Sequence, residues 1–351
     1  MSETQAVRID GSHGEGGGQT LRTSLSLSVL TGRPVEISSI RAGRSKPGLQ
    51  PQHLAAVRAA AAISAARTEG VEPGSTRLLF APQSPAAPGV YHFEIGTAGA
   101  ATLVAQTVLL PLARAGASSR VAVVGGTHVP HAPSADYLSE IYVPTLSDHG
   151  LQMDITVPAV GFLPRGGGRL EMNIRPSPQG TPVELTGRGP LRSVTATVLA
   201  AGLPPDVAMR GTAALREKLG KVKADIRVTH REAYSLGPGA AVFLTAEDET
   251  GWRTGFSALG ARGKPIEAVA GEAVAAFDRW HQTGAACEEH LADQLVLPMA
   301  LTSGRSRWTT SEVTEHLRTV LWVVPQFLDV SVLLEENADG SGTVILRGVS
   351  L

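Results

Sequence analysis

Short runs of β-branched residues alternate along the chain with longer segments rich in Ala and Leu. In the first half, the strand pattern recurs at about residues 7–9, 35–40, 76–80, 91–95, 119–124 and 183–186, with three short strands between 153 and 174. Helical periodicity recurs at about residues 19–30, 51–67, 100–115 and 134–148. This order is neither a strict alternation of strands and helices nor a succession of strands alone. It predicts an α/β sandwich built from small sheets, each backed by a pair of helices.

Residues 184–280 form a block with its own succession of elements. Strands are predicted at about 193–199, 226–229, 240–247 and 252–258, and helices at about 204–219 and 265–282. The block predicts a small α/β domain inserted into a larger domain of residues 1–183 and 281–351. The final segment contains two helical patterns and then a strand pair at 330–335 and 343–347. A similarity between residues 13–22 and 163–172, each with three consecutive glycines, indicates internal repetition.

Composition narrows the classes of function. The 351 residues carry a formal charge of −1, so a site for a polyanion has to be a local basic patch. A single cysteine, Cys287, excludes an internal disulfide framework and a cysteine-rich metal site. The N-terminus lacks the charged and then apolar pattern of a secretion signal, and the longest apolar stretches are shorter than a membrane span. A soluble, cytoplasmic protein is expected.

The segment DGSHGEGGGQTLR, residues 10–22, follows a predicted strand and opens a predicted helix. Free backbone N–H groups at a helix start favour an anion, although no Gly-Lys-Ser/Thr follows the glycines as in a Walker A loop. Gln19 and Arg22 are three residues apart and face the same side of the first turn. Glu15 is a candidate for holding a divalent metal or orienting a ribose. A tight glycine turn with solvated charges is the alternative.

A basic segment, RAGRSKPGLQPQH at residues 41–53, follows the second predicted strand. Five basic residues and no acidic one occur between Arg41 and Arg67. A positive stripe on a turn-rich loop is what phosphate contacts require. An ordinary basic surface loop is the alternative, and the Gly and Pro content favours a fixed loop that binds an anion.

Three further segments have less specific patterns. GGTHVPHAP at 125–133 contains two histidines three apart, but the intervening proline and the lack of a nearby cysteine argue against zinc, so we expect a proline-lined ligand wall. HLADQ at 290–294 precedes an apolar run and fits either a helix cap or a contact to a nucleotide or metal. VTEHLRT at 313–319 contains a histidine that spacing alone does not mark as catalytic.

Together these segments resemble the RNA 3′-terminal phosphate cyclase family. The resemblance lies in DGSHGEGGGQTLR, RAGRSKPGLQPQHL, the GGT…AP…D stretch at 125–136, LPRGGG, FSALGARG at 256–263 and HLADQLVLPMAL at 290–301. The segments occur in the family's order and extend from one end of the chain to the other. The resemblance implies a larger domain of repeated four-stranded sheets, each backed by two helices and similar to that of enolpyruvyl transferases, with a small inserted α/β domain.

The resemblance also implies an activity. Members of the family use ATP to convert an RNA 3′-phosphate into a 2′,3′-cyclic phosphate in three nucleotidyl transfers. A histidine takes AMP from ATP, AMP passes to the RNA 3′-phosphate, and the vicinal 2′-hydroxyl then expels AMP. The family's histidine lies in a V-T-x-H-x-x-T context that residues 313–319 match, so His316 is the expected nucleophile. ATP, Mg²⁺ or Mn²⁺, and an RNA with a 3′-phosphate end are expected to bind.

The same matching implies roles around the phosphates. Glu15 is the expected metal-binding carboxylate. His13, just before the glycines, matches no role. The residues expected to line the triphosphate and the RNA phosphate are Arg22, Arg41, Arg44, Gln52 and His53.

Around the nucleoside, Asp293 and Gln294 are expected to lie beside the nucleotide. Pro133, or alternatively Pro130, is a candidate for one wall against adenine. His290 stands where the family can have an aromatic residue, and its ring is the candidate for the opposing wall.

Two other functions are weighed against this one. A non-catalytic branch of the family binds RNA and acts in eukaryotic ribosome assembly, and it lacks the nucleophilic histidine. The presence of His316 and of the whole basic segment argues against that branch. An enolpyruvyl transferase forms no covalent AMP intermediate, is usually longer and has different basic loops.

Overall fold

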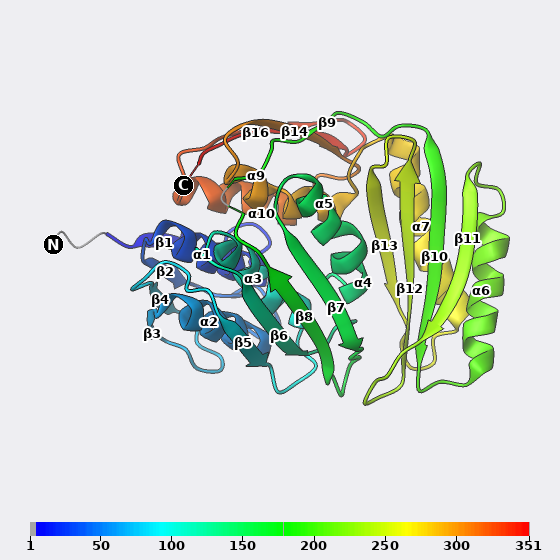
Figure 1. Ribbon diagram of the computed structural model, residues 1–351, viewed down its shortest axis with the longest axis horizontal. Coiled ribbons are helices and arrows are strands. Elements are labelled where there is room, and N and C mark those ends of the chain that lie inside the picture. Colours follow the sequence, from blue (N-terminus) through cyan, green and yellow to red (C-terminus); the bar gives the residue numbers. More distant parts are fainter. Residues whose placement is uncertain (1–4, 178, 351) are drawn as a thin grey trace.

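The computed structural model describes residues 5–177 and 179–350, which contain four sheets of four strands each (Figure 1). Three of the sheets follow the same path along the chain, strand–helix–strand–helix–strand–strand. In each of them the first two strands are parallel neighbours, and the fourth strand lies antiparallel between the second and the third. The predicted repetition of four-stranded units backed by helices is therefore confirmed.

The three units take their elements from successive parts of the chain. The first comprises β1 (Val7–Asp10), α1 (Gly18–Thr31), β2 (Val35–Ser38), α2 (Pro51–Ser64), β3 (Arg67–Glu69) and β4 (Leu78–Ala81). The second comprises β5 (Val90–Glu94), α3 (Ala101–Ala113), β6 (Ser119–Gly125), α4 (Ala135–Tyr137) continued by η1 (Leu138–Tyr142) and α5 (Val143–Asp148), β7 (Met153–Ala159) and β8 (Gly168–Ile174). The third comprises β9 (Glu184–Leu185), α8 (Glu289–Gln294), α9 (Val296–Ala300), β14 (Gly304–Thr310), α10 (Glu315–Val323) with η2 (Val324–Gln326), β15 (Ser331–Glu336) and β16 (Gly342–Gly348).

The fourth sheet interrupts the third unit between β9 and α8. Its elements are β10 (Leu191–Ala201), α6 (Pro205–Leu219), β11 (Asp225–Glu232), β12 (Gly239–Asp248), β13 (Arg253–Leu259) and α7 (Ile266–Thr283). It lies at one end of the molecule, with α6 and α7 on its outer face (Figure 1). Its other face contacts η1, where Thr245 donates a hydrogen bond to Glu140 at 3.0 Å. The division of the chain into two domains stays a prediction.

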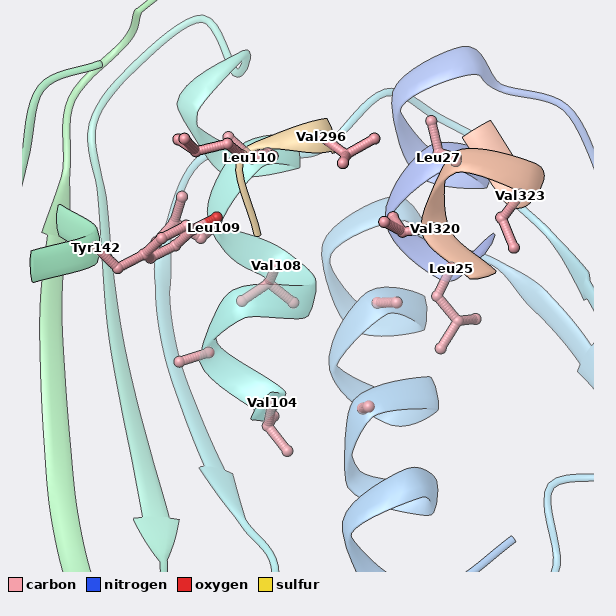
Figure 2. Close-up of a cluster of buried hydrophobic side chains, with 14 of the residues drawn as sticks. Leu25, Leu27, Val104, Val108, Leu109, Leu110, Tyr142, Val296, Val320 and Val323 are labelled. Atoms are coloured by element: carbon pink, nitrogen blue, oxygen red, sulfur yellow. The ribbon is translucent and has the colours of Figure 1, made fainter. Parts of the chain in front are cut away.

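The helices of the three units pack against one another between the sheets. α1 contacts α2, α3 and α10, and the alanines of α2 are small enough for α3 to approach closely. Figure 2 shows part of this core, to which α1 contributes Leu25 and Leu27, α3 contributes Val104 and Val108, and α10 contributes Val320 and Val323. This packing fixes the starts of α1 and α10 relative to each other.

Several predicted strands and helices were wrong in detail. The helix predicted to extend to residue 67 ends at Ser64, because Ala65 adopts a left-handed φ of 49°, and the polar residues beyond it form β3. Only two strands, β7 and β8, occur where three were expected. β14 was not predicted, because Ser306 and Thr310 fill buried positions and hide the alternation of polar and apolar residues.

The similarity between the two glycine segments predicted repetition, which is confirmed, but the segments are not equivalent positions of the repeat. Residues 14–18 lead from β1 into α1, whereas residues 166–168 lead from β7 into β8. The units repeat in topology, but these two segments occupy different places in them. Across the described residues 5–177 and 179–350, none of the helices combines the length and the apolar composition that a membrane span requires.

Candidate active site

The glycine loop, residues 11–17, leaves the start of α1 open. Asp10 accepts hydrogen bonds from the backbone N (3.0 Å) and the hydroxyl (2.7 Å) of Ser12. Gly14 and Gly16 have φ of 60° and 59°, which a side chain disfavours. Gly17 precedes α1 and, as a glycine, brings no side chain to cap it. The first N–H groups of α1 are therefore available to an anion.

His316 lies at the start of α10, against the glycine loop. Thr314 caps this helix by accepting a hydrogen bond from the backbone N of Leu317 at 3.1 Å. Nδ1 of His316 lies 2.5 Å from Oε1 of Gln19 and 2.7 Å from Oε2 of Glu15. Because both neighbours are acceptors, Nδ1 carries the ring proton and donates it. The lone pair of the neutral imidazole is therefore on Nε2.

The surroundings of His316 favour its neutral form. Burial is the largest influence and lowers its pKa below the usual 6.5. The charges of His290, Arg22 and Arg44 act in the same direction, while the carboxylate of Asp293 opposes them. At neutral pH the ring is therefore an unprotonated base, as a nucleophile requires.

Two arginines bring positive charge to the glycine loop. Arg44 belongs to the basic loop, residues 41–50, and forms an ion pair with Oε1 of Glu15. Arg22 is half-buried in α1, where burial lowers its pKa to about 10 although nearby Asp293 raises it. At this pKa the guanidinium remains charged at neutral pH. The loop is thus bordered by two permanent cations.

Gly18, the first residue of α1, is closely flanked by two predicted phosphate ligands. A Cβ placed there would lie 2.4 Å from Nε2 of His53 and 2.7 Å from Nη1 of Arg22. A side chain at this position would push both groups away from the helix start. His53 is buried, and burial together with Arg22 and Arg41 lowers its pKa to about 3. Its imidazole is therefore neutral.

Several polar residues of the predicted site also bind the protein itself. Nδ1 of His53 accepts a hydrogen bond from the backbone N of Gln50 at 3.1 Å, which closes the start of α2. Oε1 of Gln52 accepts one from the backbone N of Ala100 at 3.0 Å. Arg41 donates to two carbonyls of its own loop. These contacts give the basic loop and its junction with α2 a fixed shape.

Asp293 is a buried carboxylate of α8. Burial raises its pKa to about 6, and neighbouring basic side chains act against this rise. A second buried carboxylate, Glu288, caps the same helix and accepts a hydrogen bond from the hydroxyl of Tyr137 at 2.5 Å. Burial raises the pKa of Glu288 to about 7. The start of α8 is thus held from within the core while Asp293 acts on His316.

The remaining predicted nucleotide ligands have varied surroundings. Oε1 of Gln294 accepts a hydrogen bond from Gln106 of α3 at 2.7 Å. His290 is exposed, and its ring lies within 4.8 Å of two glutamate carboxylates at the start of α8. Pro133 is half-buried in the loop before α4. Their roles beside a nucleotide stay predictions.

Six predicted residues therefore gather around the starts of α1 and α10. They are Glu15, Arg22, Arg44, His53, Asp293 and His316. Sequence reasoning missed Gln19 as a partner of His316, although its place directly after the glycines was the available signal. It also assigned no role to His13, whose ring stacks on Trp322 of α10.

Comparison with known proteins gives a consistent result. Residues 13–334 match the family described as RNA 3′-terminal phosphate cyclase. A protein of that name from Pyrobaculum neutrophilum is 44% identical over 332 residues, 94% of this chain and 95% of the relative. Another, from Gloeothece citriformis, is 44% identical over 325 residues, 91% of this chain and 93% of the relative.

Among solved structures, the enolpyruvyl transferase NikO from Streptomyces tendae is 10% identical, with a TM-score of 0.35 over 99% of this chain and 48% of that one. This likeness is too weak to carry an argument. The sequence relatives are different, because they match at high identity along almost the whole of both chains. The chain belongs to the RNA 3′-terminal phosphate cyclase family.

Proposed function

We propose that this chain uses ATP and a divalent metal to convert an RNA 3′-phosphate into a 2′,3′-cyclic phosphate, with His316 as the residue that carries AMP. The orientation of His316 carries the proposal, because Gln19 accepts a hydrogen bond from Nδ1, with the carboxylate of Glu15 2.7 Å away, and this leaves a lone pair on Nε2. The adjacent arginines and helix starts supply the positive charge that phosphoryl transfer needs.

In the first step, Nε2 of His316 bonds to the α-phosphorus of ATP. The bond from that phosphorus to the bridging oxygen breaks, and pyrophosphate leaves with its electron pair. The ring keeps its proton on Nδ1 and becomes cationic, so the carboxylate of Glu15, 2.7 Å away, stabilises the new charge. Arg22 and Arg44 offset the charge of the phosphates.

Oε2 of Glu15 is buried and makes no hydrogen bond to the described residues, so this carboxylate fits a divalent metal that arrives with the nucleotide. Mg²⁺ in nucleotide sites is held by one or two carboxylates together with phosphate oxygens and water. Glu15 supplies one carboxylate at the mouth of the glycine loop and would hold Mg²⁺ or Mn²⁺. When bound, the metal neutralises phosphate charge.

In the later steps, an oxygen of the RNA 3′-phosphate attacks the phosphorus of AMP, and the P–N bond breaks to return neutral His316. The 2′-hydroxyl of the same nucleotide then attacks the activated phosphorus and loses its proton to water, and AMP leaves with the electron pair of the broken P–O bond. We also propose that the protein is cytoplasmic. The remaining proposed contacts are those of Arg41, Gln52 and His53 with phosphates, of Asp293 and Gln294 with the nucleotide, and of Pro133 and His290 with adenine.

An RNA with a labelled 3′-phosphate tests the function. With ATP and a divalent metal, we expect the end to become a cyclic phosphate that resists phosphatase. The same RNA with a 2′-deoxy terminal nucleotide lacks the third nucleophile, so it should stop at the RNA–adenylate. Folded protein that leaves both RNAs unchanged, or that cyclises without ATP, contradicts the proposal.

The pH dependence of AMP transfer follows from His316. Attack requires neutral imidazole, and burial lowers the folded-state pKa of this group below 6.5. The initial rate of label transfer from α-labelled ATP is therefore expected to remain above half of its full value as pH falls from about 8 to about 6.5. The midpoint of the decline should lie at lower pH, where the ring is protonated. A midpoint at or above the usual pKa of histidine contradicts this account of the site.

A further inference from the structure

Three consecutive residues of the glycine loop lie along one face of α10 in a regular register. Each step of one residue along the loop is matched by a step of three residues along α10, and the two segments run in opposite directions. Residues three apart share a face of an α-helix, so residues 13–15 form a docked strip on α10. The contacts of this strip join Glu15 with His316, Gly14 with Thr319, and His13 with Trp322.

The middle of the docked strip touches the helix through backbone. Oγ1 of Thr319 accepts a hydrogen bond from the backbone N of Glu15 at 3.3 Å. A Cβ on Gly14 would lie 2.4 Å from the same oxygen, and the φ of Gly14 is +60°. The strip is therefore close enough to α10 that a side chain at Gly14 is excluded.

The outer end of the strip is held by two rings. His13 stacks on Trp322 with centroids 3.8 Å apart and planes inclined by 18°. His13 is exposed and Trp322 is half-buried in α10. Gly14 has no side chain, so Glu15 and His13 are the residues of the strip whose side chains contact α10. The His13 ring holds the end of the strip away from His316. The stack therefore limits how far the loop can slide along the helix.

The spacing leaves little freedom for other registers. Consecutive Cα atoms are about 3.8 Å apart, and three residues of α-helix rise about 4.5 Å. The two steps agree closely enough for three successive contacts. A slip by one contact would move Glu15 from His316 to Thr319, a hydroxyl instead of an imidazole.

We propose that His13 and Trp322 are positioning residues, whose stack sets where the carboxylate of Glu15 meets Nδ1 of His316. The inference rests on the proposed function, in which His316 takes AMP from ATP. Small errors in the placement of reacting groups lower rates strongly. Loss of the stack therefore slows AMP transfer while the nucleophile and the nucleotide contacts remain.

Single-turnover AMP transfer tests the proposal in His13→Ala, Trp322→Ala, the double variant and Trp322→Phe. Each alanine variant should slow transfer about tenfold, with the half-saturating ATP concentration within about twofold of the original. The double variant should be no slower than the slower single one, because both remove one contact. Trp322→Phe retains a ring and should restore most of the rate. Arg318→Ala, whose ion pairs reach Glu315 and Glu336, is the matched control with unchanged transfer.

A second measurement is independent of activity. Hydrogen exchange at the backbone N–H of Glu15 should accelerate in His13→Ala and Trp322→Ala, with exchange in the sheets unchanged. Accelerated exchange supports the docking even if the original protein fails to form the adenylate, in which case only the proposed function is lost. Unchanged exchange overturns the inference, as do unchanged transfer, an effect on half-saturating ATP alone, or additive single effects. His13→Ala keeps the test decisive if Trp322→Ala does not fold, because His13 is exposed.

Discussion

Replacing His316 by alanine is expected to abolish transfer of AMP to the protein, with label from α-labelled ATP falling by about 10³-fold or more. In the proposed reaction, the imidazole of His316 is the protein group that forms a covalent bond to the α-phosphorus of ATP, and the substitution removes it. Stability should change by less than about 1 kcal/mol, since the side chain of His316 is partly exposed at 42%. Denaturing electrophoresis after incubation with ATP and metal measures the label, and thermal unfolding measures the fold.

His92→Ala is the matched control for this experiment. His92 lies on β5, pairs with Glu94 at 3.1 Å and has a side chain that is 48% exposed, similar to that of His316. It should accept label as the original protein does. If His316→Ala retains normal labelling, another residue is the nucleophile and the assignment is wrong. The label should also be acid-labile, as expected of a phosphoramidate.

Replacing Glu15 by glutamine is expected to slow AMP transfer by about 10- to 100-fold. Glutamine preserves the size of the side chain but cannot offset the positive charge that develops on His316. It also removes the ion pair with Arg44 and the proposed metal ligand. Initial rates at several metal concentrations measure the effect, and the metal concentration for half-maximal rate should rise.

Glu36→Gln is the control for the loss of a carboxylate. Glu36 lies on β2, pairs with Arg77 at 2.8 Å and is outside the proposed site. Its rate and metal dependence should be unchanged. An unaffected rate in Glu15→Gln contradicts the role of Glu15 beside His316. A lower rate with an unchanged metal requirement leaves Glu15 as the partner of the imidazole and contradicts its role as a metal ligand.

Local sequence patterns predicted most elements of the fold, because apolar periodicity identifies the buried face of each helix and strand. The pattern failed where polar residues are buried. β14 is the clearest case, since Ser306 is fully buried and its hydroxyl accepts a hydrogen bond from the backbone N of Val183 at 3.2 Å. The order of strands in each sheet also has no local signal, because it depends on which segments pair after the helices have packed.

The candidate site, like the fold, could be predicted from the sequence only in part. The glycine loop and the basic loop are continuous in sequence, so their chemistry was visible in their residue types. The partners of His316 were not, because Gln19 is 297 positions away along the chain. The stack of His13 on Trp322 likewise depends on how the loop lies against α10. The family resemblance identified His316 as the expected nucleophile. The structure added the neighbours of His316 that determine which ring nitrogen carries the proton.

The measurement that tests the central claim most directly starts from protein that has reacted with ATP and has then been freed of nucleotide. Mass spectrometry of its peptides should find AMP on His316. Adding an RNA with a 3′-phosphate should discharge that AMP and produce one cyclic end for each AMP released. Folded protein with no AMP on His316, or an adenylate that this RNA leaves in place, would contradict the account.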